Sequence, residues 1–169
     1  MIKLFLNYTA TLALLLFFII SCNTSATDSY TKSVLFCKKY GNDDFSLYEG
    51  AYICFRGNEN KYNLYLLQMP ISDNNALTLN ICYKDSIDYK ILSGNNYKFD
   101  TIKIITMINR FRIYGLYELR YPKHNGNLYL NFTREHSTLI RFKNDEEKNK
   151  VLSERLRIIK ISDLWFYLK

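Results

Sequence analysis

Short segments in which apolar and polar residues alternate are the feature of this sequence that most limits the folds it can adopt. The alternation is clearest within residues 51–56 and 77–84. Because successive side chains of a β-strand point to opposite faces, this period of two predicts strands with one buried face. The predicted inward residues of these two segments are Ala51, Ile53 and Phe55, and Leu77, Leu79, Ile81 and Tyr83.

The same reasoning predicts strands along most of the chain, separated by clusters of Gly, Asn and Asp. The predicted strands cover residues 34–40, 47–56, 62–69, 77–84, 89–92, 97–108, 111–121, 128–132, 138–143, 158–161 and 164–168. Asn125-Gly126 follows the strand with the clearest alternation, 111–121. This dipeptide predicts a hairpin with a two-residue type I′ turn, because both central positions of that turn require a positive φ.

One segment carries helical signals instead. Asn144 can cap a helix, and three acidic residues follow it in the first turn, where they suit the helix dipole. Leu152, Leu156 and Ile159 then recur at helical spacing. We therefore expect the only substantial helix at about residues 145–157, followed by a short strand.

These elements predict a mainly β fold, a single antiparallel β-barrel or sandwich of about eight strands with one C-terminal helix. The strand at 138–143 that leads into one amphipathic helix is similar to the end of pleckstrin-homology-like barrels. A helix followed by one more strand is similar to the lipocalin ending. Neither resemblance decides between a barrel and a sandwich.

The first 22 residues have the composition of a leader. Lys3 gives a cationic start, residues 12–20 are apolar, and polar residues follow Ser21-Cys22, as in a secretory signal peptide. Ile19-Ile20-Ser21-Cys22 resembles the lipobox of bacterial lipoproteins, which implies cleavage before Cys22 and lipidation of its thiol. The resemblance divides the chain into a signal peptide at 1–21, a lipidated flexible tether at 22–32 and a single β-rich domain at 33–169.

A lipobox implies a protein of the cell envelope, anchored to a membrane by lipid and outside the cytoplasm. A plain secretory signal, which would release a secreted protein without a lipid, stays open as an alternative. A membrane-spanning helix is disfavoured, because Asn7 and Thr11 interrupt the apolar stretch.

The chain is basic, with a net charge of +7. The leader contains one of the 23 basic residues and none of the 16 acidic ones, so the rest of the chain carries +6. Such a charge can attract nucleic acid, an acidic protein or anionic head groups. Because an exported protein meets little nucleic acid, we expect no nucleic-acid partner.

Cys37, Cys54 and Cys82 remain after lipidation of Cys22, and an odd number of cysteines cannot all pair. One disulfide with one free thiol is possible in an oxidising compartment. The alternative is three buried or half-buried thiols that act as small hydrophobic groups.

Catalytic and metal-binding signatures are missing from the sequence. It contains no G-x-S-x-G, G-x-G-x-x-G, Walker or H-E-x-x-H motif. His124 and His136 fall in predicted turns, and Asp43-Asp44 falls in a predicted loop before a strand. We therefore expect no enzyme, no cofactor and no metal site.

Aromatic residues are in excess, with 15 Tyr, 11 Phe and one Trp. Most lie on predicted inward faces, but four tyrosines and two arginines lie on the opposite faces: Tyr52, Tyr65, Tyr114, Tyr129, Arg112 and Arg120. Exposed tyrosine beside arginine is typical of protein-binding surfaces, and tyrosine also stacks on sugars. The alternative is a set of cross-strand pairs that stabilise a solvated sheet.

We therefore expect a non-enzymatic binding module whose partner is a protein, as for an inhibitor, an immunity-type protein or an accessory subunit. The alternative is a carrier that holds a small apolar ligand or a lipid inside a lipocalin-like barrel.

Overall fold

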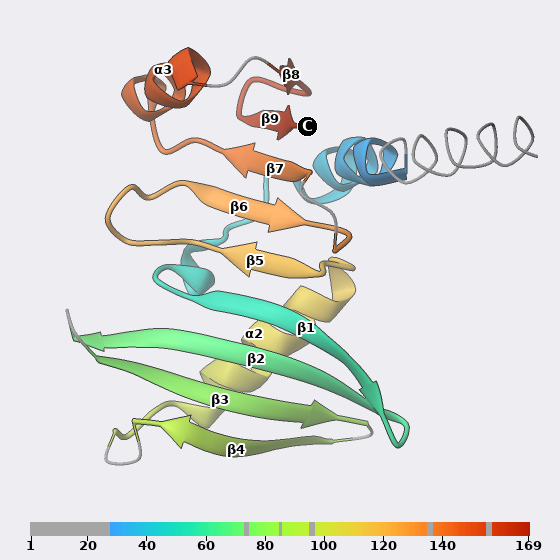
Figure 1. The fold of residues 1–169 in the computed structure, drawn as a ribbon, viewed down its shortest axis with the longest axis vertical. Coiled ribbons are helices and arrows are strands. Elements are labelled where there is room, and N and C mark those ends of the chain that lie inside the picture. The colour runs from blue at the N-terminus through green and yellow to red at the C-terminus, as the bar shows by residue number, and fades with distance from the viewer. Residues whose placement is uncertain (1–27, 73–74, 85, 95–96, 135–136, 155–156) are drawn as a thin grey trace, which may run out of the picture.

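The computed structural model describes residues 28–72, 75–84, 86–94, 97–134, 137–154 and 157–169. Nine strands form one antiparallel sheet in the order β4-β3-β2-β1-β5-β6-β7-β9-β8 (Figure 1). The strands are β1 (Tyr52–Glu59), β2 (Tyr62–Ser72), β3 (Asn75–Tyr83), β4 (Ile87–Ser93), β5 (Glu118–Arg120), β6 (Leu128–Asn131), β7 (Thr138–Arg141), β8 (Ile158–Lys160) and β9 (Trp165–Leu168). The sheet is open, with β4 and β8 as its edges.

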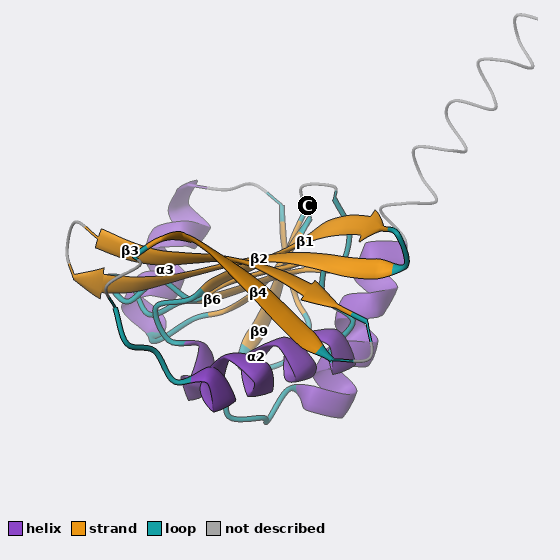
Figure 2. Ribbon diagram, turned by 90° about the horizontal axis from the view of Figure 1, so that it is seen from below, coloured by secondary structure: helices purple, strands orange, loops and turns teal. Residues whose placement is uncertain are grey.

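The helices cover the two faces of the sheet to different extents. One helix covers residues 28–40, η1 is Ser46–Tyr48, α2 is Thr101–Ile113 and α3 is Asp145–Glu154. Figure 2 shows α2 along one side of the sheet, which we call the covered face. Figure 1 views the opposite side, the open face, over which α3 lies at one end.

The main core lies between α2 and the covered face. Ile104, Met107, Ile108 and Phe111 follow the i, i+3, i+4, i+7 spacing of one helix face, and all four are buried. They pack with the alternating inward residues of β1, β2, β3 and β5, namely Ile53, Leu67, Leu77, Leu79, Ile81 and Leu119. Each fully buried aliphatic side chain contributes about 1.5–3 kcal/mol relative to an exposed one.

A cluster of aromatic rings continues this core at the other end of the sheet. Phe36, from the helix of residues 28–40, packs against Phe45, Tyr114 and Trp165 with ring centroids 5.5–6.2 Å apart. The Trp165 indole N–H donates a hydrogen bond of 2.9 Å to the Gly41 carbonyl. These contacts attach the helix of residues 28–40 firmly to the covered face.

The predicted fold class is confirmed: the protein is mainly β, with one antiparallel sheet and a C-terminal helix followed by short strands. The α3 N-terminus also forms as expected, since the Asn144 side chain accepts a hydrogen bond of 2.9 Å from the Glu147 N–H. The sheet is not closed into a barrel. The carrier alternative therefore lacks the barrel interior that it requires, and Ile53, Leu79 and Leu119 belong to a filled core.

Three predicted strands are wrong. Residues 34–40 lie within a helix, and the segments 97–108 and 111–121 contain α2 and the short strand β5. The Asp100 side chain caps α2 by accepting a hydrogen bond of 3.1 Å from the Lys103 N–H. The α2 helix is rich in isoleucine, which favours strands in isolation, but packing of one helical face overrides that preference. α3 is therefore one of three longer helices among the described residues.

The predicted tether also needs correction. Residues 28–32 of the segment 22–32 are the first turns of the helix that packs on the sheet. Ser29 and Ser33 are buried, and the Ser137 hydroxyl donates a hydrogen bond of 2.7 Å to the Ser29 hydroxyl. The signal peptide, Cys22 and residues 23–27 lie outside the described residues.

The type I′ turn is not at Asn125-Gly126. Strands β5 and β6 do pair, but residues 121–127 connect them, and in that connection positive φ occurs at Gly126. The two consecutive residues with positive φ are instead Asn60 (48°) and Lys61 (71°), directly between paired Glu59 and Tyr62. The tight turn therefore joins β1 to β2, where the sequence lacks the usual glycine.

Candidate functional site

A row of polar and aromatic side chains crosses the open face of the sheet. The strand register aligns Gln68, Tyr52, Arg120, Tyr129, Ile140 and Phe166 across β2, β1, β5, β6, β7 and β9. Ile140 and Phe166 are buried, and Phe166 packs against the Phe142 ring at 5.3 Å. The accessible part of the row is Gln68, Tyr52, Arg120 and Tyr129.

Arg120 is the central residue of this row. Its guanidinium carbon lies 5.6 Å from the centroid of the Tyr129 ring, and its Nε forms an ion pair of 3.0 Å with Glu118. The other Glu118 oxygen accepts a hydrogen bond of 3.1 Å from the Asn131 amide. Arginine, tyrosine and carboxylate therefore hold one another in fixed positions on the sheet.

Cys54, Glu118 and Asn131 form the neighbouring row on the same face. Burial raises the pKa of the Tyr52 hydroxyl, and the adjacent Cys54 thiol and Glu118 carboxylate raise that pKa further. Asn131 is buried, and its side-chain oxygen has no hydrogen-bond partner in the described part of the chain. We call the six residues of these two central rows the open-face cluster: Tyr52, Cys54, Glu118, Arg120, Tyr129 and Asn131.

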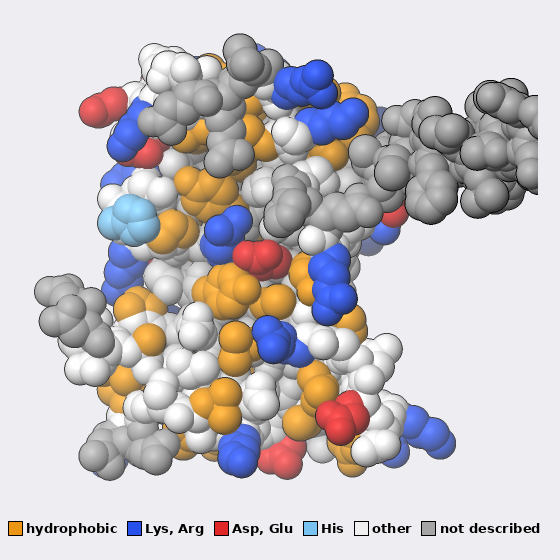
Figure 3. Space-filling view, in the orientation of Figure 1, with side chains coloured by type: hydrophobic (Ala, Val, Ile, Leu, Met, Phe, Trp, Pro, Cys, Tyr) orange, Lys and Arg blue, Asp and Glu red, His pale blue; other side chains and the backbone are white. Residues whose placement is uncertain are grey.

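The surface around the open-face cluster mixes apolar and basic side chains. Figure 3 shows hydrophobic groups gathered across the middle of this face, with Lys and Arg side chains among them. Leu66 on β2 lies beside Cys54 in the register and is half-buried. The open face is therefore a platform of rigid strands with partly exposed aromatic groups.

The six predicted contact residues do not share one surface. Tyr52, Tyr129 and Arg120 lie together as described, but Tyr65 and Tyr114 are only 5% and 7% exposed. Tyr65 belongs to the covered face, and Tyr114 follows α2 rather than lying in a strand. The prediction that these two tyrosines are exposed is wrong. Tyr65 lies on the buried side of β2, and Tyr114 lies at the end of a helix, where strand alternation does not apply.

Arg112 and Tyr114 have structural contacts instead. The Arg112 guanidinium stacks 3.4 Å from the centroid of the Tyr83 ring. The Tyr114 hydroxyl donates a hydrogen bond of 2.9 Å to the Asp43 carboxylate. Burial and this carboxylate raise the pKa of Tyr114 to about 12.

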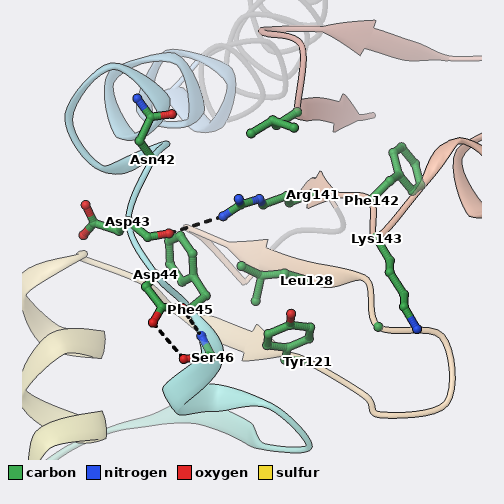
Figure 4. A pocket seen from close by; sticks show the side chains of 12 residues that line it. Asn42, Asp43, Asp44, Phe45, Ser46, Tyr121, Leu128, Arg141, Phe142 and Lys143 are labelled. Atoms are coloured by element: carbon green, nitrogen blue, oxygen red, sulfur yellow. Dashed lines mark hydrogen bonds between the residues drawn. The ribbon is translucent and has the colours of Figure 1, made fainter.

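A second feature is a hollow of about 480 Å³ on the other side of the sheet (Figure 4). It lies between the loop at 42–46, the β5–β6 connection and the end of β7. Its lining includes Asp43, Phe45, Tyr121, Leu128, Arg141 and Lys143. Asp43 was visible in the sequence as a loop carboxylate, and Phe45 belongs to the same loop. Tyr121, Leu128, Arg141 and Lys143 come from segments about 80–100 residues further along the chain.

The three cysteines within the described ranges are free thiols. Cys54 lies opposite Leu66 on β2, and Cys82 lies opposite Leu64, so a whole strand separates the two. Cys37 is half-buried on the helix of residues 28–40, and burial raises its pKa to about 12. Of the two interpretations from the sequence, these thiols fit the one without a disulfide.

The described residues contain no group of three His, Cys, Asp or Glu side chains that could hold a metal ion. His124 is exposed in the β5–β6 connection, whereas His136 lies outside the described residues. Among the helices within those ranges, none is both long and apolar enough to span a membrane.

No protein-family model matches the chain, and neither the curated proteins nor the solved structures contain a match to it.

Proposed function

We propose that this protein is a non-enzymatic binding module of the cell envelope, whose open-face cluster contacts another protein. The observation that carries the proposal is the row Tyr52–Arg120–Tyr129, which the strand register holds on a face that α2 leaves uncovered. Tyrosine and arginine are among the residues that most often dominate binding energy at protein interfaces.

The arrangement favours a protein partner with an apolar centre and an acidic rim. Tyr52, Tyr129 and Leu66 offer half-buried apolar surface, and the ion pair with Glu118 orients the Arg120 guanidinium beforehand. A side chain that is already fixed loses less conformational entropy when a partner binds. The chain without its leader carries +6, so acidic groups around the contact would accelerate association.

The cellular localisation in this proposal is inferred from the sequence. Ile19-Ile20-Ser21-Cys22 supports cleavage and lipidation at Cys22, and a secreted protein without the lipid is the alternative. Mass spectrometry of the N-terminal peptide distinguishes the two. We expect an acylated peptide that begins at Cys22, and we expect Cys22→Ala to stay unprocessed; an unmodified N-terminus beyond Cys22 would establish the secreted form.

Site-specific photocrosslinking tests the binding surface. A photoreactive phenylalanine analogue replaces Tyr129 in one variant and Tyr97 in a matched control, since Tyr97 is exposed far from the open-face cluster. We expect a discrete crosslinked product from position 129 and none from position 97. Adding Arg120→Glu should abolish that product.

Two results would contradict the proposed surface. One is equal crosslinking from positions 129 and 97, which would indicate random collisions. The other is a product at position 129 that Arg120→Glu leaves unchanged, provided that thermal unfolding shows the variant to be folded.

A further inference from the structure

A hollow beside Arg141 lies apart from the surface of the proposed protein contact. Its volume of about 480 Å³ falls within the range of about 300–1,000 Å³ that is usual for small-molecule sites. It lies on the covered face, beyond the end of α2, and opens between the loop at 42–46 and β7 (Figure 4). A ligand there would not touch the open-face cluster.

Arg141 has most of its hydrogen-bonding capacity unused. Its side chain is half-buried, and one N–H group donates a hydrogen bond of 3.3 Å to the Asp43 backbone carbonyl. Its guanidinium carbon also lies 5.8 Å from the Trp165 ring. Within the described segments, no carboxylate lies at ion-pair distance from this guanidinium, which has five N–H groups in all.

The acidic side chains of the lining are already paired with neutral donors. Both oxygens of Asp44 accept hydrogen bonds of 2.8 Å from Ser46, one from its N–H and one from its hydroxyl. One oxygen of Asp43 accepts from the Tyr114 hydroxyl at 2.9 Å. Arg141 also lies close enough to Asp44 to help lower the pKa of that carboxyl. Its charge is therefore partly compensated, but in the described part of the chain most of its N–H groups remain available as donors.

Another part of the lining is apolar or aromatic. Figure 4 shows Leu128 and Tyr121 beside the space that the Arg141 side chain crosses, with Phe45 on the loop opposite. Lys143 lies at the far side over Gly126, whose lack of a side chain makes room for the lysine stem. A guanidinium thus borders an apolar surface, with a second cation at the rim.

We propose that this hollow binds a single carboxylate attached to an apolar group, with the carboxylate on Arg141 and the apolar part on the half-buried Tyr121 ring. The planar guanidinium can donate two parallel hydrogen bonds to a carboxylate. A phosphate dianion fits less well, because Asp43 and Asp44 repel two negative charges about twice as strongly as the single charge of a carboxylate. Both a small organic acid and the C-terminus of a peptide present this chemistry.

Fluorescence of Trp165 provides the test, because it is the only tryptophan of the chain and its ring adjoins Arg141. The full chain in mild detergent is titrated with N-acetyl-phenylalanine, with its neutral amide N-acetyl-phenylalaninamide and with inorganic phosphate. We expect a saturable change with the acid and none with the amide or phosphate. A peptide ending in a free phenylalanine carboxylate distinguishes the sources: tighter binding than the acid indicates a peptide terminus, and weaker binding a small acid.

Two variants and a matched control connect the signal to the hollow. Arg141→Lys keeps the charge but removes the second parallel hydrogen bond, so we expect affinity for the acid to fall at least about tenfold. Lys143→Gln should weaken binding only about two- to threefold, since a cation at the exposed rim is screened. Lys90→Gln changes an exposed lysine on the distant edge strand β4 and should leave binding unchanged.

The proposal fails if the acid gives no saturable change, or if the acid and its amide bind equally well. It also fails if Arg141→Lys binds the acid like the unmodified chain. Should that variant not fold, the comparison of acid with amide still decides the question. The test is independent of the proposed protein contact, because no residue of the open-face cluster lines the hollow.

Discussion

Replacing Phe36 by alanine tests whether the helix of residues 28–40 belongs to the folded domain. Phe36 is 4% exposed and contacts the rings of Phe45, Tyr114 and Trp165, as well as two further rings. Truncating a buried phenylalanine costs about 3–5 kcal/mol in transfer free energy and cavity formation. Because this ring is the centre of the cluster and has five aromatic neighbours, we expect Phe36→Ala to lower the free energy of unfolding by about 4 kcal/mol.

Leu35 provides the matched control, since it occupies the same helix but is 58% exposed. Leu35→Ala should change the free energy of unfolding by no more than about 0.5 kcal/mol. Urea unfolding followed by Trp165 fluorescence measures both variants, because Trp165 itself contacts Phe36. If the two substitutions had equally small effects, the segment would be a tether and the description of this helix as part of the core would be refuted.

Two further predictions concern backbone strain and alkaline pH. Lys61→Gly should raise the free energy of unfolding by about 1 kcal/mol in urea titrations, because glycine adopts the positive φ of Lys61 without steric cost; a loss of stability would contradict the turn geometry. Stability should fall as pH rises from about 10 to 12, since Tyr114 ionises first in the unfolded chain. Tyr114→Phe should make this pH dependence shallower, and an unchanged slope would show that Tyr114 is not protected.

Prediction from the sequence succeeded for elements that have one face of apolar residues and one face of polar residues. In β1 and β3, inward Ile53 and Leu79 alternate with outward residues. β3 forms at the predicted place, and β1 coincides with the second half of the predicted strand at 47–56, whose first half contains η1 instead. The acidic start of α3 and its Asn144 cap are equally local signals. Such elements depend on neighbours within a few residues, so a single sequence contains the information.

The α2 helix was missed because its exposed face is also apolar. Ile102 and Ile113 face solvent while Ile104 and Ile108 are buried, so isoleucines on both faces obscure the helical period. Burial against the sheet, rather than local preference, decides which of these side chains point inward. That contact joins segments about 50 residues apart. The helical spacing of Ile104, Met107, Ile108 and Phe111 after the cap Asp100 is nevertheless a local signal, and it was overlooked in favour of strands.

The candidate sites were predictable only in part, for the same reason. The outward direction of Tyr52 and Tyr129 follows from alternation within their strands. Their meeting at Arg120 depends on the pairing of β1 with β5 and of β5 with β6. The hollow also depends on the contact of Arg141 with Asp43, and these two residues are about 100 positions apart in the chain.

Packing of the helix of residues 28–40 against the sheet also limits how far the domain can stand from a lipid on Cys22. The described part of this helix starts with Asp28, six residues after that cysteine. A fully extended chain advances only about 3.5 Å per residue, so the segment between Cys22 and Asp28 spans at most roughly 20 Å. A lipid-anchored form would therefore work close to the bilayer surface, and its partners would have to reside at the same membrane or approach it directly.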